Sequence, residues 1–233
     1  MIALMAKRIL TLFLSFLILE GIVGTPIFAV SFSVGGLRVN KEVRNMREIK
    51  RKNIVTQSLD YSCGAAGLST LLHYYHGDAV SEKDIIATIL QFVPLEKIKE
   101  RKGFSLLDLK NFAQTKGYKV TGYKMDMDFL RKLGKPVLVP IKFKNYSHFV
   151  IVKAVLANRV FIADPAAGNM SMKIDKFKNI WTNGIGLIIE RENSSGEYAL
   201  QVKNEDMIIT DYKLLRRLVD QAFIRTAIFT SEY

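Results

Sequence analysis

A chain of 233 residues, of which 49% are hydrophobic and 10% aromatic, can bury a domain-sized core, which excludes a disordered or fibrous protein. Its formal net charge of +12 favours anionic partners, such as acidic peptides, a membrane surface or nucleic acid, but a charge is not itself a binding site. The single cysteine has no partner for an intrachain disulfide, so it is a buried hydrophobe, an intermolecular link or a reactive thiol.

The first 29 residues have the pattern of a secretory signal. Lys7 and Arg8 precede an apolar run over 9–19, which is too short to cross a hydrocarbon core of about 30 Å as a helix. Ala29 offers a small residue for cleavage, although Ile27 is not small. We expect a cleaved signal peptide over 1–29 and a periplasmic or secreted protein, with an uncleaved inner-membrane anchor as the alternative.

The next part of the chain is predicted to be helical. A basic lead-in over 30–53 has apolar residues at a spacing of three, which indicates a short amphipathic helix or an irregular segment. Residues 53–56 are predicted to form a short strand. Ser81 and Ser105 are each followed by an aspartate three residues later, as at a helix N-cap. Helices are therefore predicted over four segments: 64–75, 81–92, 105–117 and 126–133.

After Gly134 the pattern changes to short β-branched runs separated by turn residues. Strands are predicted over 136–143, 148–156, 160–163 and 186–189, with a hairpin turn at 157–159. A helical first half followed by an antiparallel sheet is an α+β arrangement. The main domain is expected over 54–190. A C-terminal appendage is expected over 191–233, with a polar break at 192–196, then a weak strand and a basic helix at 212–223.

Cys63 is predicted to lie at the start of a helix, directly after a loop. There the unpaired N–H groups and the positive end of the helix dipole favour the thiolate. Gly64 leaves space for a substrate backbone, so Ser62 and Gly64 are the candidate substrate-binding positions. Gln57 lies six residues earlier, and its side-chain NH₂ with the backbone N–H of Cys63 would form a two-donor oxyanion hole.

A base for Cys63 must come from one of three histidines. His73 and His76 lie roughly 15–20 Å along the same helix, at about 1.5 Å per residue, and are predicted to be surface or interface residues. A metal site built on that pair lacks a third ligand. His148 opens a strand and Asp164 closes the next, so both fall at one end of a hairpin whose register, including a bulge, is left open. Asp164 would accept from one ring nitrogen and leave the other facing Cys63.

The ordered set of Gln57, Cys63-Gly64, the strand from His148 and the segment 164–168 (DPAAG) resembles the bacteriocin-processing cysteine peptidases, which cleave leader peptides after double glycine. The resemblance covers about residues 54–189. It implies a papain-like fold, with a nucleophile helix in the helical half, a Cys63–His148–Asp164 triad and Gln57 in the oxyanion hole. It also implies no metal or organic cofactor. The best-known members are cytoplasmic domains fused to an exporter, whereas this chain is more similar to stand-alone exported members found with secretion systems, including some that export amyloid-type fibres.

The resemblance implies an exported cysteine peptidase that processes or matures an exported peptide or protein. Its expected partners are that substrate, secretion-system components and the membrane surface. Two other functions stay open: a non-catalytic peptide-binding module of the same fold, and a cell-wall peptide amidase that uses the same residues. Nucleic-acid binding is not supported, because the sequence contains no recognisable motif for it.

Overall fold

The computed structural model describes residues 29–34, 37–42, 45–143, 146–191, 198–203 and 206. It divides into two compact units, the first ending at Asn45. The first unit contains an antiparallel hairpin of β1 (Ala29–Val34) and β2 (Leu37–Glu42). Apolar and polar residues alternate over 30–34, which is the period of a strand, so our prediction of a helix or irregular segment is wrong for this part. The apolar run at 9–19 and the predicted helix at 212–223 lie outside the described residues.

The second unit begins at Met46 and carries its helices mainly in its first half. Capping boxes confirm the predicted helix starts at Ser81 and Ser105. Residues 53–56 form no strand, so that prediction is wrong. None of the helices within the described ranges is long and apolar enough to span a membrane. The helices are α2 (Met46–Arg51), α3 (Cys63–Tyr74), α4 (Glu82–Leu90), α5 (Leu95–Arg101), α6 (Leu106–Thr115), α7 (Met127–Leu133) and α8 (Ile174–Ile180).

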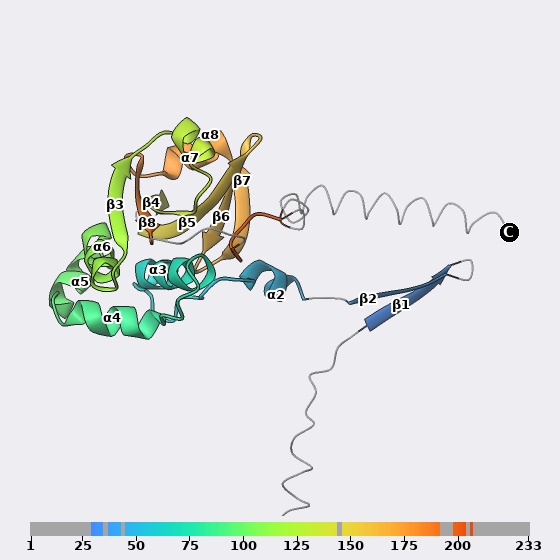
Figure 1. Cartoon of the computed structure of the whole chain (residues 1–233), viewed down its shortest axis with the longest axis horizontal. Coiled ribbons are helices and arrows are strands. Elements are labelled where there is room, and N and C mark those ends of the chain that lie inside the picture. Colours follow the sequence, from blue (N-terminus) through green and yellow to red (C-terminus); the bar gives the residue numbers. More distant parts are fainter. Residues whose placement is uncertain are drawn as a thin grey trace, which may run out of the picture. The chain divides into compact units, whose positions relative to one another are not determined.

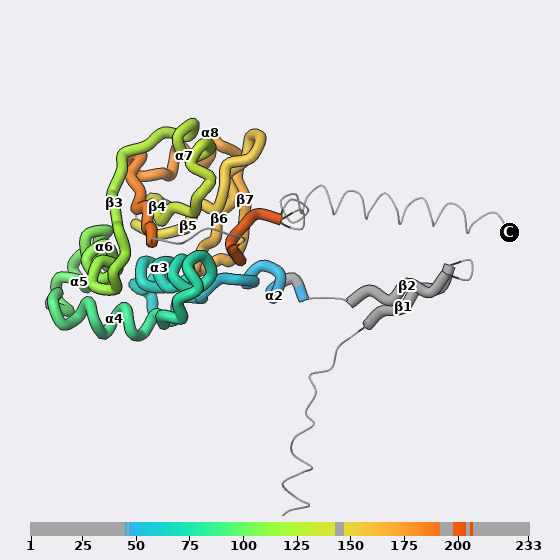
Figure 2. The backbone as a smooth tube through the Cα atoms, in the orientation of Figure 1, coloured from blue at the N-terminus to red at the C-terminus, as the bar shows by residue number. Residues whose placement is uncertain are grey.

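The second half of this unit forms a six-stranded sheet in the order β3-β8-β4-β5-β6-β7, with every neighbouring pair antiparallel. Figure 2 shows how the chain returns after β7, so that β8 lies between β3 and β4. The four predicted strands are present, and two others, at 119–124 and 168–173, were not predicted. The strands are β3 (Lys119–Lys124), β4 (Val137–Phe143), β5 (Tyr146–Leu156), β6 (Arg159–Asp164), β7 (Gly168–Lys173) and β8 (Ile185–Glu190).

Each face of the sheet packs against a different set of helices (Figure 1). Side chains of α3, α4 and α6 form one hydrophobic core with Phe149 and Ile151 of β5. Side chains of α7 and α8 form a second core with Val150 and Val152 of the same strand. This alternation is the one expected of a strand that is buried on both faces. The fold is therefore α+β, as predicted.

Candidate active site

Cys63 is the first residue of α3 and is 3% exposed. The N-cap residue, Ser62, makes no side-chain hydrogen bond to the helix, so no capping side chain occupies the first-turn N–H groups. Those groups and the helix dipole give this end of α3 a partial positive charge. A thiolate at Cys63 therefore lies where the backbone stabilises negative charge.

His148 lies on β5 and Asp164 ends β6, and their side chains are hydrogen-bonded at 2.8 Å between His148 Nε2 and Asp164 Oδ1. A carboxylate only accepts, so Nε2 carries the proton and Nδ1 is left for a second partner. Burial lowers the pKa of His148, but hydrogen bonds with Asp164 and with Cys63 outweigh burial and raise this pKa to about 9. The structure thus brings Cys63, His148 and Asp164 into one hydrogen-bonded cluster.

A β-bulge determines that these two side chains share a face of the sheet. From the turn, β5 and β6 pair as Leu156↔Arg159 and Ala154↔Phe161, and the register then shifts by one so that Ile151 faces Ala163. His148 is three residues from Ile151 and Asp164 one residue from Ala163, so His148 and Asp164 lie on the same side of their strands. Without the shift, Asp164 would stand opposite Ile151 and on the other face from His148.

The extra residue of the bulge is Lys153, which is 7% exposed. Its ammonium donates to Asn169 Oδ1 at 3.1 Å and lies 3.6 Å from the Asp206 carboxylate. The amide of Asn169 in turn donates to the Lys52 carbonyl at 2.8 Å. A buried charge needs such partners, and here they hold the bulge in place.

The Asp164 carboxylate is held by the turn that follows it. Besides the ring of His148, Oδ1 accepts from the backbone N–H of Ala166 at 2.7 Å and of Ala167 at 3.1 Å. Burial raises the pKa of Asp164, but the hydrogen bonds from His148 and from these two N–H groups produce a net lowering. The sequence identified the segment 164–168 but not this function of its backbone.

Gln57 lies on the loop before α3 and is tied to the same turn, because its backbone N–H donates to the Pro165 carbonyl at 3.1 Å. Its side-chain Nε2 donates to the Leu59 carbonyl at 3.1 Å. An amide nitrogen carries two hydrogens, so one is left for another acceptor. The side-chain oxygen of Gln57 is buried and has no hydrogen-bond partner among the described residues.

The two other predicted site residues have clear structural tasks. Ser62 is buried, and its hydroxyl donates to the Leu59 carbonyl at 2.8 Å and accepts from the Leu59 N–H at 3.1 Å. A Cβ on Gly64 would lie 3.0 Å from a Leu109 methyl and 3.1 Å from the Phe149 ring. Both residues therefore fit their local packing, and substrate binding by Ser62 and Gly64 stays a prediction.

The remaining histidines lie on α3 and the turn after it, apart from the cluster. The ring of His76 is hydrogen-bonded through Nε2 to the Ile189 carbonyl at 3.1 Å, and burial lowers its pKa. His73 is exposed and packs edge-on against Tyr74. Among the described residues, no group of three or more His, Cys, Asp or Glu side chains is placed to hold a metal ion.

Comparison with known proteins gives a consistent result. The family model described as "Peptidase C39 family" matches residues 51–194. The chain is 35% identical over 157 residues to the probable functional amyloid protease FapD of Pseudomonas fluorescens, a match that covers 67% of this chain and 69% of that protein. It is 33% identical to the protein of the same name from Pseudomonas aeruginosa, over 65% of this chain and 66% of that protein. The match thus spans about two thirds of either relative.

A solved structure gives the fold. The crystal structure of the peptidase domain of Streptococcus ComA, described as a bifunctional ABC transporter involved in quorum sensing, aligns with a TM-score of 0.50 and 24% identity. The alignment covers 60% of this chain and 98% of that domain. The lactococcin-A transport/processing ATP-binding protein LcnC of Lactococcus lactis is 28% identical, over 78% of this chain and 25% of that protein.

Proposed function

The chain belongs to the Peptidase C39 family and is a cysteine-type peptidase of papain-like fold, and from this premise we propose that Cys63 is its nucleophile, His148 its general acid and base, and Asp164 the residue that orients His148. The observation that carries the proposal is the cluster of these three side chains, since the sulfur and the carboxylate both hydrogen-bond to one imidazole ring. The three residues lie far apart in sequence and on different elements.

In this mechanism the Cys63 thiolate attacks the carbonyl carbon of the scissile peptide bond, and the carbonyl oxygen becomes an oxyanion. The backbone N–H of Cys63 and the free hydrogen of the Gln57 amide donate to that oxyanion. A pKa of about 9 keeps His148 protonated at neutral pH, so its ring is ready to give a proton to the leaving amine. The ring, now neutral, then accepts a proton from the water that hydrolyses the thioester.

Asp164 keeps the imidazole in the tautomer that this cycle needs. It accepts from Nε2 throughout, so Nδ1 is the nitrogen that exchanges a proton with sulfur, amine and water. Three hydrogen bonds to Oδ1, from His148, Ala166 and Ala167, hold the carboxylate without help from solvent.

The experiment that tests the mechanism is alkylation of Cys63 by iodoacetamide as a function of pH. The chain has one cysteine, so mass spectrometry of the intact protein reports this thiol alone. We expect the wild type to be alkylated faster than His148→Ala at neutral pH, because the imidazolium pairs with the sulfur. An inert thiol, or the same pH dependence of alkylation in wild type and His148→Ala, would contradict the mechanism and favour a peptide-binding module.

We propose further that the substrate is an exported peptide or protein of a secretion system, including one that assembles amyloid-type fibres, and that the protein acts outside the cytoplasm. The similarity to FapD, described as a probable functional amyloid protease, supports the substrate class. The basic and apolar pattern of residues 1–29 supports export.

The substrate is sought by comparing exported proteins from cells that carry wild-type or Cys63→Ala chain. Labelling of protein N-termini, followed by mass spectrometry, should show new ends only with the wild type. Identical N-termini in both would argue against an exported protein substrate. Cell fractionation tests localisation, and recovery of the chain only in the cytoplasm would refute export.

A further inference from the structure

The carboxylate of Glu82 is buried but is not used by the helix that it begins. Glu82 is the first residue of α4 and is 6% exposed. The N-terminus of α4 is capped instead by Ser81 and Asp84, which form a reciprocal capping box. A buried carboxylate is costly unless strong hydrogen bonds compensate for its lost hydration, so the partner of Glu82 is informative.

That partner is the backbone of the loop that carries Gln57. The two oxygens of Glu82 lie 3.0 and 3.2 Å from the backbone nitrogen of Ser58. This N–H belongs to the peptide group that directly follows Gln57. The peptide group on the other side of Gln57 donates to the Pro165 carbonyl at 3.1 Å. The backbone of Gln57 is thus held on both sides by residues from outside its loop.

We propose that Glu82 is a positioning residue, which fixes the backbone at Gln57 so that the side-chain amide points at the oxyanion. The inference rests on the proposed function, because it assigns Glu82 a task in the oxyanion hole. Glu82 touches no reacting atom and acts only through Gln57. With the carboxylate removed, the peptide group after Gln57 loses this hydrogen bond. The backbone then no longer fixes the position of the Gln57 side-chain amide.

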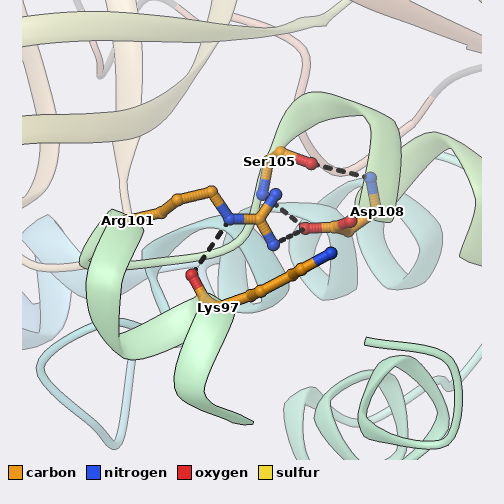
Figure 3. Close-up of polar contacts among 4 residues, drawn as sticks. All are labelled: Lys97, Arg101, Ser105 and Asp108. Carbon is orange, nitrogen blue, oxygen red and sulfur yellow. Dashed lines mark hydrogen bonds and ion pairs between the residues drawn. The ribbon is translucent and has the colours of Figure 1, made fainter. Parts of the chain in front are cut away.

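The chain offers two matched controls. Asp84→Ala removes the capping box from the same first turn of α4 without touching Ser58. Asp108→Ala removes another largely buried carboxylate from the first turn of a helix, where it accepts from the Ser105 N–H at 2.8 Å and from Arg101 at 3.2 Å (Figure 3). In both controls a helix N-terminus is weakened, but the hydrogen bond from the Ser58 N–H to Glu82 is kept.

The first readout needs no substrate. In ¹⁵N-labelled wild type we expect the side-chain amide of Gln57, assigned by its loss in Gln57→Ala, to give a dispersed and slowly exchanging NH₂ pair, because it donates to the Leu59 carbonyl. Glu82→Ala should move this pair to the position of an unstructured amide. Asp84→Ala and Asp108→Ala should leave the pair unchanged. An unchanged pair in a folded Glu82→Ala protein overturns the proposal, whatever the enzymatic activity.

The second readout is hydrolysis of a fluorogenic peptide that ends in Gly-Gly-aminomethylcoumarin. Glu82→Ala should lower kcat by about 10- to 100-fold with KM and Cys63 alkylation unchanged, less than the full loss of an oxyanion-hole donor. Glu82→Gln, which still accepts from Ser58, should restore most of kcat. In a Gln57→Ala background, Glu82→Ala should have no further effect, because Glu82 acts through Gln57.

These outcomes separate the two proposals. A wild type that shows no His148-dependent alkylation refutes the catalytic mechanism, while the Gln57 resonances still decide whether Glu82 positions that side chain. Additive losses in the double variant, or a Glu82→Gln protein as impaired as Glu82→Ala, overturn the role of Glu82 alone. Should Glu82→Ala not fold, Glu82→Asp is the second variant. It keeps the charge, but its shorter side chain moves the carboxylate away from Ser58, so the same changes in the Gln57 resonances and in kcat are expected.

Discussion

Replacing Asp164 by Asn keeps the shape of the side chain but removes the charge that His148 faces. A histidine pKa that rises from 6.5 to about 9 means that folding stabilises the protonated ring. At about 1.4 kcal/mol per pKa unit, this stabilisation is roughly 3 kcal/mol, supplied by Asp164 and Cys63 against the effect of burial. In Asp164→Asn only Cys63 still counteracts the lowering of the His148 pKa by burial. We therefore expect the pKa of His148 to fall by more than one unit. We also expect kcat/KM to fall by about 10²- to 10⁴-fold.

The assay is an NMR titration of the histidine ring protons. The chain has three histidines, and His148→Gln identifies the resonance of interest. Asp175→Asn, which changes an exposed aspartate on α8, serves as a control that should leave this resonance unchanged. Wild-type titration at or below 6.5, or an Asp164→Asn protein with an unaltered His148 pKa, would refute the electrostatic reasoning.

The same shift makes stability depend on pH. Because the folded-state pKa of His148 lies above its unfolded value, the folded protein binds more protons between pH 6.5 and about 9. The contribution of His148 to the free energy of unfolding is therefore complete below pH 6.5 and is lost as the pH rises through about 9. Urea denaturation across this range should show this decline in the wild type and a weaker one in Asp164→Asn.

Two further substitutions test the oxyanion hole and the turn beside Asp164. Gln57→Ala should lower kcat by about 10²- to 10³-fold without raising KM, measured on the Gly-Gly peptide, and a change confined to KM would point to substrate binding instead. Gly168 has a φ of +88°, and a Cβ there would lie 2.5 Å from the Lys50 carbonyl oxygen, so Gly168→Ala should cost more than about 2 kcal/mol in urea denaturation. Gly117 has a similar φ of +82° and open space around it, so Gly117→Ala should cost only about 1 kcal/mol; equal losses would show that the contact with Lys50 is unimportant.

Much of the fold could be predicted because its signals are local. Ser81 and Ser105 each precede an aspartate by three residues, and that spacing alone specifies a capping box. The position of Cys63 at a helix start followed from the periodicity after it. The hairpin that brings His148 and Asp164 together followed from the turn between two β-branched runs.

The unpredicted features depend on contacts between distant segments. Glu82 reaches Ser58 across 24 residues of sequence, and no local pattern marks a carboxylate that serves another loop. The bulge at Lys153 was left open, because its position is decided by partners such as Asn169 on β7. The strands β1 and β2 were missed although residues 30–34 alternate, because apolar residues at a spacing of three later in the segment 30–53 indicated a helix.

The bulge in β5 makes the His148–Asp164 pair depend on whether the number of residues between them is odd or even. Each single-residue insertion or deletion between the bulge and the turn would reverse which face one of the two side chains occupies, whereas a change of two would restore it. The hairpin can therefore lengthen or shorten only in steps of two if the pair is to survive. One extra residue within either strand of this hairpin would need a second bulge elsewhere in the same ladder to keep the pair on one face.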